Sequence, residues 1–417
     1  MGKIHKLDQS EFASMAKMQQ DAYPGAFGQT AKDREQIIER MTKRLDDSRV
    51  GYYGLKRDDQ LVGCMSLHDF KMNLRGQMLK AGGVGAVAVD LAHKKEKIAA
   101  EMMTEYLKRY RQTGYPMAVL WPFRPDFYRK MGFGYAGSVY RYRVQPESLP
   151  KSDLRQLVRM LTSDDLPSVV ACYNRYVSRT NAMIEESEVG LRSLFSKEGG
   201  TRVYGFERDS QLEGYIAFRF TDKSQDSFIL YDLQVDHLMH DNPDALAGMI
   251  GFLQSQLDQV RYVKFDLPDN SLHFFTNDPR DGSDRITRPV NHQVGHMAVG
   301  FMCRTINIPA TLEALSDSSF GAIDMKVKFE VSDSFMPENS GNYGIESANG
   351  RLQTTDPGAC DLTVSLDVAE LSSLLVGAAR PKDLYKYGLI QLSDPGHLAS
   401  LDTLFATDHE PHCLTPF

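Results

Sequence analysis

Residues 87–100 have the types and the order that could bind a ligand carrying phosphates. A strand-like segment ends at Val87-Ala88-Val89, and the basic cluster His93-Lys94-Lys95-Glu96-Lys97 leads into an amphipathic helix predicted from about Glu96 to Gln112. A helix N-terminus presents free backbone N–H groups and a partial positive charge to an anion. The lysines of the cluster add charge that can neutralise a pyrophosphate. The segment therefore predicts an anion site.

The end of the strand adds a second feature to this anion site. Its backbone N–H and C=O groups can pair with an extended ligand that contains amides. Coenzyme A has both parts, because it joins a pantetheine arm with two amides to phosphate groups. The other interpretation is a core strand followed by a solvated basic turn, and these residues alone leave both interpretations open.

Tyr128 is a candidate general acid. It follows an apolar strand predicted at Met117–Trp121, and a phenol with a pKa of about 10 can protonate a departing thiolate. A packing aromatic residue is the competing interpretation. Trp121 and Phe123 are interpreted as walls of a pocket.

Composition limits the classes of protein to consider. The 417 residues indicate about two to four domains, and 42% hydrophobic with 25% charged residues is ordinary for a globular protein. The net charge of −7 does not indicate non-specific nucleic-acid binding. The five cysteines are far apart and form no CxxC pair, so we expect reduced thiols and no metal. Neither a signal peptide nor a transmembrane helix is expected.

Residues 1–150 predict a first compact α/β unit. Helices are expected at 9–22 and 31–46, with Thr30 as the N-cap of the second. Strands are expected at 50–55, 60–67, 74–80, 81–89, 117–121 and 134–144, with one helical turn at 127–131.

Residues 151–290 predict a second unit with a similar order of elements, and residues 291–417 an α+β unit. In the second unit the segment from His237 to Asn242 replaces the basic cluster, so no anion site is expected there. In the third unit strands are expected at 300–306, 324–331, 341–347, 351–354 and 362–364, with helices at 367–376 and around 397–405.

The segments at 87–100 and 127–134 resemble the GNAT acetyltransferase superfamily. Two GNAT-like units followed by a sterol-carrier-like domain are similar to the Eis (enhanced intracellular survival) family of N-acetyltransferases. The last domain contributes to this resemblance with the segments 304–310, 324–333, 366–375 and 411–417. The order of these elements extends over essentially the whole chain.

The resemblance implies two tandem GNAT domains, each a mixed sheet flanked by helices, and a sterol-carrier-protein-2-like α+β domain. It also implies that acetyl-CoA binds without a metal, that Tyr128 is the general acid, and that the terminal carboxylate of Phe417 is the general base. The residues expected to hold acetyl-CoA are Val87, Ala88, Val89, Lys95, Glu96, Lys97, Ile98, Ala99, Ala100, Phe123 and Arg124. The loop departs from the GNAT pattern at Lys97, where a glycine is usual, and Glu96 adds a negative charge.

The resulting hypothesis is an acetyl-CoA-dependent N-acetyltransferase. By resemblance, its acceptors are amines of aminoglycosides, lysine side chains or polyamines, and it is a cytoplasmic homo-oligomer, often a hexamer, without a nucleic-acid or membrane partner. The alternative is a non-catalytic binding protein, in which the GNAT site is degenerate and the sterol-carrier-like domain holds an apolar ligand.

Overall fold

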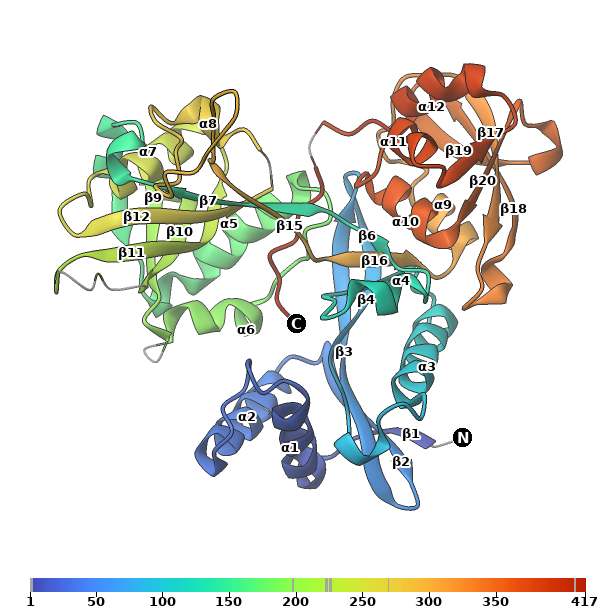
Figure 1. Ribbon diagram of the computed structural model, residues 1–417, viewed down its shortest axis with the longest axis horizontal. Helices are drawn as coiled ribbons and strands as arrows, with labels where there is room; N and C mark the ends of the chain where they lie inside the picture. The colour runs from blue at the N-terminus through green and yellow to red at the C-terminus, as the bar shows by residue number, and fades with distance from the viewer. Residues whose placement is uncertain (1–2, 197–198, 222–223, 225–226, 269, 409) are drawn as a thin grey trace. The chain divides into compact units, whose positions relative to one another are not determined.

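The computed structural model of the protein describes residues 3–196, 199–221, 224, 227–268, 270–408 and 410–417 (Figure 1). Its internal contacts divide the chain into two units. The first combines Met1–Ala136, Phe301–Thr407 and Thr415–Phe417, and the second combines Gly137–Gly300 and Asp408–Leu414.

The first unit contains a seven-stranded sheet in the order β1-β2-β3-β4-β5-β16-β6. Its strands are β1 (Lys3–Lys6), β2 (Val50–Arg57), β3 (Gln60–Leu74), β4 (Gln77–Val89), β5 (Met117–Leu120), β16 (Met302–Thr305) and β6 (Gly134–Tyr135). The helices of this part are α1 (Phe12–Ala22), α2 (Ala31–Arg44), α3 (Ile98–Gln112) and α4 (Pro125–Arg129). Thr30 caps α2 by accepting a hydrogen bond from the Asp33 N–H, as predicted.

Helices cover both faces of this sheet, as Figure 1 shows for α1 and α2 on one side and α3 on the other. Residues of α1 and α2 pack with Tyr52, Cys64 and Ala88 of the strands. The apolar side of α3 forms the opposite core with residues such as Leu55, Val62 and Met65, so the alternation of strand side chains places one apolar layer on each face.

The strand predicted at 74–80 is wrong, because a hairpin turn at residues 75 and 76 separates its first residue from the others. The sequence predicted separate strands at 74–80 and 81–89, whereas β3 ends at Leu74 and β4 runs unbroken from Gln77 to Val89. The two turn residues, Arg75 and Gly76, both have positive φ, of 50° and 85°, as a tight two-residue hairpin requires. The guanidinium of Arg75 donates to the carbonyls of Leu375 and Phe405. These hydrogen bonds stabilise the arginine in a backbone conformation that this residue type rarely adopts.

A strand predicted within the last domain belongs to the first sheet instead. β16 pairs antiparallel with β5, from Met302↔Leu120 to Thr305↔Met117, and also with β6. This long-range pairing leaves no local signal in the sequence. Arg304 of β16 is fully buried, is ion-paired with Asp333 and donates to the carbonyl of Met131 just after α4.

The rest of the first unit is an α+β layer on a five-stranded sheet ordered β19-β18-β17-β20-β21. The strands are β17 (Met325–Ser332), β18 (Gly341–Ala348), β19 (Arg351–Thr355), β20 (Leu362–Asp367) and β21 (Ile390–Leu392), and the helices are α9 (Ile308–Ala314), α10 (Val368–Val376), α11 (Pro381–Lys386) and α12 (Leu398–Leu404). Helix α10 joins the two sheets, since the Ser372 hydroxyl accepts a hydrogen bond from the Thr305 N–H of β16.

The second unit has its own seven-stranded sheet, ordered β15-β7-β12-β11-β10-β9-β8. Its strands are β7 (Ser138–Val144), β8 (Val158–Met160), β9 (Arg202–Arg208), β10 (Gln211–Thr221), β11 (Tyr231–His240), β12 (Val260–Leu267) and β15 (Gly295–Val299), with a small hairpin of β13 (Ile286–Thr287) and β14 (Asn291–His292). Its helices are α5 (Leu166–Arg179), α6 (Glu188–Leu191), α7 (Pro243–Gln254) and α8 (Leu272–Phe275).

The predicted strand at 134–144 is also divided between the two sheets. Its first residues form β6, and the remainder forms β7, which pairs with β12 and β15. Alternating side chains predict strand conformation but not the sheet that a strand joins, so local pattern did not reveal this division.

Candidate active site

Strands β4 and β5 separate at the place where the sequence predicted an amide-binding strand. Their parallel pairing runs from Ala81↔Met117 to Val84↔Leu120, where β5 ends. The hydroxyl of Tyr106 donates to the Gly82 carbonyl at 2.7 Å and accepts from the Val119 N–H at 3.2 Å just before this point. Beyond it, the β5-facing edge of residues 85–89 has no strand partner within the described ranges.

The residues predicted to bind an amide arm lie along this open edge. The β3–β4 register shifts between Cys64 and Ser66, opposite a bulge at which Ala86 has φ of 50°. Ala88 is buried and packs under α1, whereas Val87 and Val89 are half-buried. The Val87 carbonyl accepts a hydrogen bond from the hydroxyl of Tyr23, a residue that the sequence did not single out.

The predicted anion site lies at the N-terminus of α3. The first hydrogen bond inside the helix runs from the Glu101 N–H to the Lys97 carbonyl at 3.0 Å. The N–H groups of Ile98, Ala99 and Ala100 therefore have no acceptor inside the helix, and none is found for them elsewhere in the described chain. Lys97 has φ of 64°, the left-handed conformation for which glycine is favoured, so this loop adopts a glycine-like conformation without a glycine.

Charges around this helix terminus remain favourable to an anion. The Glu96 carboxylate is paired with Arg57 at 2.9 Å and lies 3.3 Å from His93. Arg57 also pairs with Glu101 at 2.7 Å. Lys95 and Lys97 are exposed and have no carboxylate partner among the residues the structure describes. The negative charge of Glu96 is thus balanced within the protein, whereas the lysines are available to a ligand.

Tyr128 lies in α4 inside a cluster of aromatic rings. It is 3% exposed, and its ring contacts Phe123, Phe127 and Phe133 edge-on. Its hydroxyl has no hydrogen-bond partner in the described ranges. Burial, with a smaller contribution from Tyr23, raises the pKa of Tyr128 well above that of an ordinary phenol, so the proton stays on its oxygen at neutral pH.

The two predicted binding residues before α4 differ from each other. Phe123 is 61% exposed, and its ring centroid lies 6.1 Å from that of Tyr23 and 6.2 Å from that of Tyr128. Arg124 is exposed and paired with Asp126 at 2.6 Å. Phe123 therefore forms a wall next to the candidate acid, whereas the charge of Arg124 is already balanced by a neighbouring residue.

The chain ends beside the open part of β4. The indole N–H of Trp121 donates to the Thr415 carbonyl at 3.0 Å, and Arg44 donates to the Pro416 carbonyl at 3.3 Å. The ring of Phe417 packs against Phe70, with centroids 4.8 Å apart. Its carboxyl group lies against Gly85, where an added Cβ would come within 2.6 Å of the carboxyl carbon and 2.8 Å of an oxygen. Only a glycine permits this approach.

Two polar residues of β3 complete the surroundings of the terminus. His68 is 2% exposed, its Nε2 lies 2.9 Å from the Ser66 hydroxyl, and its ring is 5.4 Å from that of Phe417. Burial, with smaller effects from Arg44 and Arg49, lowers the pKa of His68 to about 3, so the ring is neutral. An isolated serine and histidine carried no signal in the sequence by which they could have been chosen.

Comparison with known proteins identifies the family. An acetyltransferase (GNAT) domain model matches residues 3–136, a second GNAT domain model matches 176–304, and a sterol carrier protein domain model matches 311–414. An uncharacterized N-acetyltransferase of Streptomyces coelicolor is 24% identical and covers 93% of both chains. The N-acetyltransferase Eis of Mycobacterium tuberculosis is also 24% identical and covers 84% of both chains. The chain is thus similar to the Eis-type N-acetyltransferases and contains two GNAT domains and a sterol carrier protein domain.

Solved structures agree with the fold of this Eis-like acetyltransferase. A GCN5-related N-acetyltransferase from Anabaena variabilis superposes with a TM-score of 0.83 at 18% identity, over 100% of both chains. Eis1 from Mycobacterium abscessus gives 0.78 at 22% identity, again over 100% of both. The predicted fold class, two GNAT domains followed by a sterol-carrier-like domain, is confirmed by the domain models. The GNAT models and the N-acetyltransferase relatives confirm the assignment to the acyltransferases.

The second GNAT domain of the Eis-like acetyltransferase lacks the features that surround α3. At the corresponding helix α7, the Asn242 side chain already accepts from the Ala245 N–H, Pro243 has no N–H, and Asp244 adds negative charge. Beyond the last β11–β12 pair, Val235↔Phe265, a space of only about 20 Å³ remains, lined in part by His412 and Leu414 of the chain's own tail. This helix terminus is poorly suited to a phosphate.

The described residues of the Eis-like acetyltransferase contain no group of histidine, cysteine and acidic side chains suited to a metal ion. None of its described helices has the length and apolar character required to span a bilayer.

Proposed function

We propose that this protein is an acetyl-CoA-dependent N-acetyltransferase that acetylates primary amines at the open end of β4. One observation carries the proposal. The segment from Gly85 to Ala100 contains a strand edge without a partner among the described residues and a helix N-terminus with free N–H groups. The terminal carboxylate lies against Gly85, and Tyr128 belongs to the apolar cluster on which Val87 and Val89 pack.

The residues at this segment fit coenzyme A. The open edge at Val87, Ala88 and Val89 would pair with the amides of the pantetheine arm. The N–H groups of Ile98, Ala99 and Ala100, with the charges of Lys95 and Lys97, would bind the pyrophosphate, and Glu96 would shape the loop through its pair with Arg57. Phe123 would cover the arm, and Arg124 would reach the phosphates only by leaving Asp126. When bound, acetyl-CoA supplies a thioester as acetyl donor.

Tyr128 would act as the general acid of the transfer. Its phenol would donate a proton to the leaving sulfur of the thioester, so that this group departs as a neutral thiol. Its raised pKa keeps this proton in place up to alkaline pH. A thiolate is a stronger base in buried surroundings than in water, so it would accept the proton that Tyr128 holds.

The carboxylate of Phe417 would act as the general base. It would accept the proton that the amine nitrogen loses on forming the amide bond, directly or through water. The backbone of Gly85, the hydrogen bond from Trp121 to Thr415 and the packing of the Phe417 ring hold the terminus in position, which reduces the entropy lost on reaching the transition state. The same negative charge would attract a cationic amine before the reaction.

We further propose amines of aminoglycosides, lysine side chains or polyamines as acceptors, and a cytoplasmic homo-oligomer, with a hexamer as the expected size. Analytical ultracentrifugation measures that size directly.

The decisive experiment is a CoA-release assay across a panel of primary amines. The wild-type protein should release CoA with at least one class of amine. Tyr128→Phe should lower kcat by about 10²- to 10⁴-fold, and one residue added after Phe417 should lower it comparably. Tyr135→Phe, at a surface tyrosine of the same unit, is the matched control and should keep its activity.

The outcomes separate the proposal from the binding-protein alternative. Calorimetric binding of acetyl-CoA that is weakened by Lys95→Ala, together with amine-dependent CoA release, supports the transferase. Turnover that is insensitive to both Tyr128→Phe and the added residue would remove these two groups from the mechanism. The absence of CoA release with every amine class would favour the non-catalytic alternative.

A further inference from the structure

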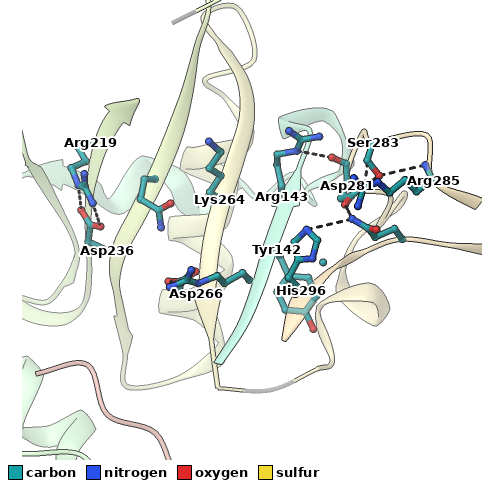
Figure 2. Close-up of a pocket in the computed structure, with 14 residues that line it drawn as sticks. Tyr142, Arg143, Arg219, Asp236, Lys264, Asp266, Asp281, Ser283, Arg285 and His296 are labelled. Atoms are coloured by element: carbon teal, nitrogen blue, oxygen red, sulfur yellow. Dashed lines mark hydrogen bonds and ion pairs between the residues drawn. The ribbon is translucent and has the colours of Figure 1, made fainter. Parts of the chain in front are cut away.

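A charged cavity of about 570 Å³ lies in the second unit and shares Asp236 and Asp266 of its lining with the small tail-lined space beyond β11 and β12. Figure 2 shows the side chains that line it, which come from strands β7, β10, β11, β12 and β15 and from the segment between β12 and β15. Its charged and hydroxyl-bearing lining includes Arg141, Arg143, Arg219, Asp281, Ser283 and Arg285.

Most charges around this cavity are balanced by neighbours. Arg219 donates to both oxygens of Asp236, at 2.9 and 3.1 Å, and Arg141 lies 3.4 Å from Asp266. Lys264 lies 2.9 Å from the buried carboxylate of Asp232 outside the cavity. These pairs account for three of the five basic side chains of the lining.

The other two basic side chains, Arg143 and Arg285, retain free donors. The Nε of Arg143 donates to the Asp281 carbonyl at 2.6 Å, and its guanidinium lies 4.4 Å above the ring of Tyr262. Its two terminal amino groups have no acceptor in the described part of the chain. Arg285 is exposed and has no carboxylate partner among the described residues. Arg143 is therefore fixed in place with a pair of parallel N–H donors available, which is the geometry that binds an oxyanion in bidentate form.

The residue whose backbone carbonyl binds Arg143, Asp281, has a buried carboxylate. Asp281 is 5% exposed, and it accepts hydrogen bonds from the Ser283 N–H at 2.9 Å, the Ser283 hydroxyl at 2.5 Å and Gln293 at 2.6 Å. Although desolvation opposes it, these bonds and the charge of Arg143 lower the pKa of Asp281. The Gln293 N–H also donates to the Arg285 carbonyl at 3.1 Å, and the Asp281 N–H donates to the Gln293 carbonyl at 3.1 Å, so hydrogen bonds connect the two ends of the segment from Asp281 to Gln293.

We propose that this cavity binds a small molecule bearing a carboxylate or phosphate group, held by the guanidinium groups of Arg143 and Arg285. Basic side chains outnumber acidic ones by five to three in its lining, in a chain whose net charge is −7. The cavity is independent of the proposed acetyl transfer, since it uses no residue of the segment around β4 and α3.

The test is isothermal titration calorimetry of the full-length protein with inorganic phosphate and, in a separate arm, with citrate, at matched ionic strength. One saturable site is expected in at least one arm, and the stronger arm identifies phosphate or carboxylate as the preferred group. Arg143→Gln and Arg285→Gln should each weaken that binding about tenfold, as expected for the loss of a charged donor. Arg280→Gln is the matched control, because this arginine is in the same segment but pairs with Asp278, and its affinity should stay unchanged.

Two results would overturn the proposal. One is the absence of a saturable site in both arms. The other is binding that Lys95→Ala abolishes and that Arg143→Gln and Arg285→Gln leave intact, because the probe would then occupy the helix N-terminus of the first GNAT domain. Arg285 is on the surface, so Arg285→Gln should fold and keeps the test valid even if Arg143→Gln unfolds. Arg285→Gln should also retain the wild-type rate of CoA release.

Discussion

Gly85→Ala should displace the chain terminus, and so lower the rate of acetyl transfer, without lowering the stability of the fold. The added methyl group would lie 2.6 Å from the carboxyl carbon of Phe417, whereas carbon atoms in contact are about 3.5–4.0 Å apart. The carboxylate must therefore retreat by about 1 Å. A displacement of this size in a reacting group costs on the order of 10²-fold in rate, equivalent to about 2.7 kcal/mol of transition-state stabilisation.

The loss should appear in kcat of the CoA-release assay. The unfolding midpoint should change little, because the terminus can move and the φ of Gly85 is outside the left-handed region. Acetyl-CoA affinity measured by calorimetry should be retained, because the residues proposed to bind it follow Gly85 along the chain. Gly51→Ala is the control, since the three atoms nearest to a methyl group there all belong to the Tyr53 side chain, the first at 3.0 Å.

Two results would refute the reasoning. The first is a folded Gly85→Ala protein whose kcat is within about threefold of wild type, which would mean that the terminus is not the base. The second concerns the variant that combines Gly85→Ala with one residue added after Phe417. Both changes displace the same carboxylate, so their effects should not add, and full additivity would contradict a shared target.

Three further variants test the surroundings of the site. Lys97→Gly should be more stable than Lys97→Ala by about 1 kcal/mol in chemical denaturation, because only glycine adopts φ of 64° without strain; equal stability would show that the loop relaxes. Asp333→Asn should lower the free energy of unfolding by about 3–5 kcal/mol, because Arg304 is left buried and charged without its partner; a loss below about 1 kcal/mol would contradict this. His68 has a pKa of about 3 when folded against about 6.5 when unfolded, so the unfolded chain binds the extra proton and stability is lost as pH falls below about 6.5. Between pH 7 and 5.5 the wild type should lose about 1.2 kcal/mol more than His68→Gln, and parallel pH curves would refute the assignment.

The elements around the proposed anion site could be predicted because their signals are local. Lysines at a helix start, apolar residues at helical spacing and the capping threonine at position 30 each act within a few residues. The position of Tyr128 after a strand was likewise visible in the sequence. The family resemblance then supplied roles that no spacing could provide, above all for Phe417.

What escaped prediction depends on long-range contacts. The hairpin turn at Arg75 was hidden because an arginine takes a conformation usual for glycine, stabilised by carbonyls about 300 positions away in the sequence. Tyr23, Ser66 and His68 gain importance only from the groups they meet in space. The charged cavity around Arg143 combines residues of five strands and of the segment between β12 and β15, and no window of the sequence contains it.

The placement of β16 has a consequence for how the protein is made and divided. During synthesis, β5 emerges long before residues 302–305, and until they arrive its antiparallel neighbour is missing and the first sheet ends in an unpaired edge. All four residues of β5 are buried in the finished protein, so this edge is apolar and prone to pair with other chains. A fragment that stops at residue 150 contains every residue proposed for acetyl-CoA but keeps that edge open. We expect such a fragment to aggregate, and useful dissection should instead retain Phe301–Thr407 together with the first 136 residues.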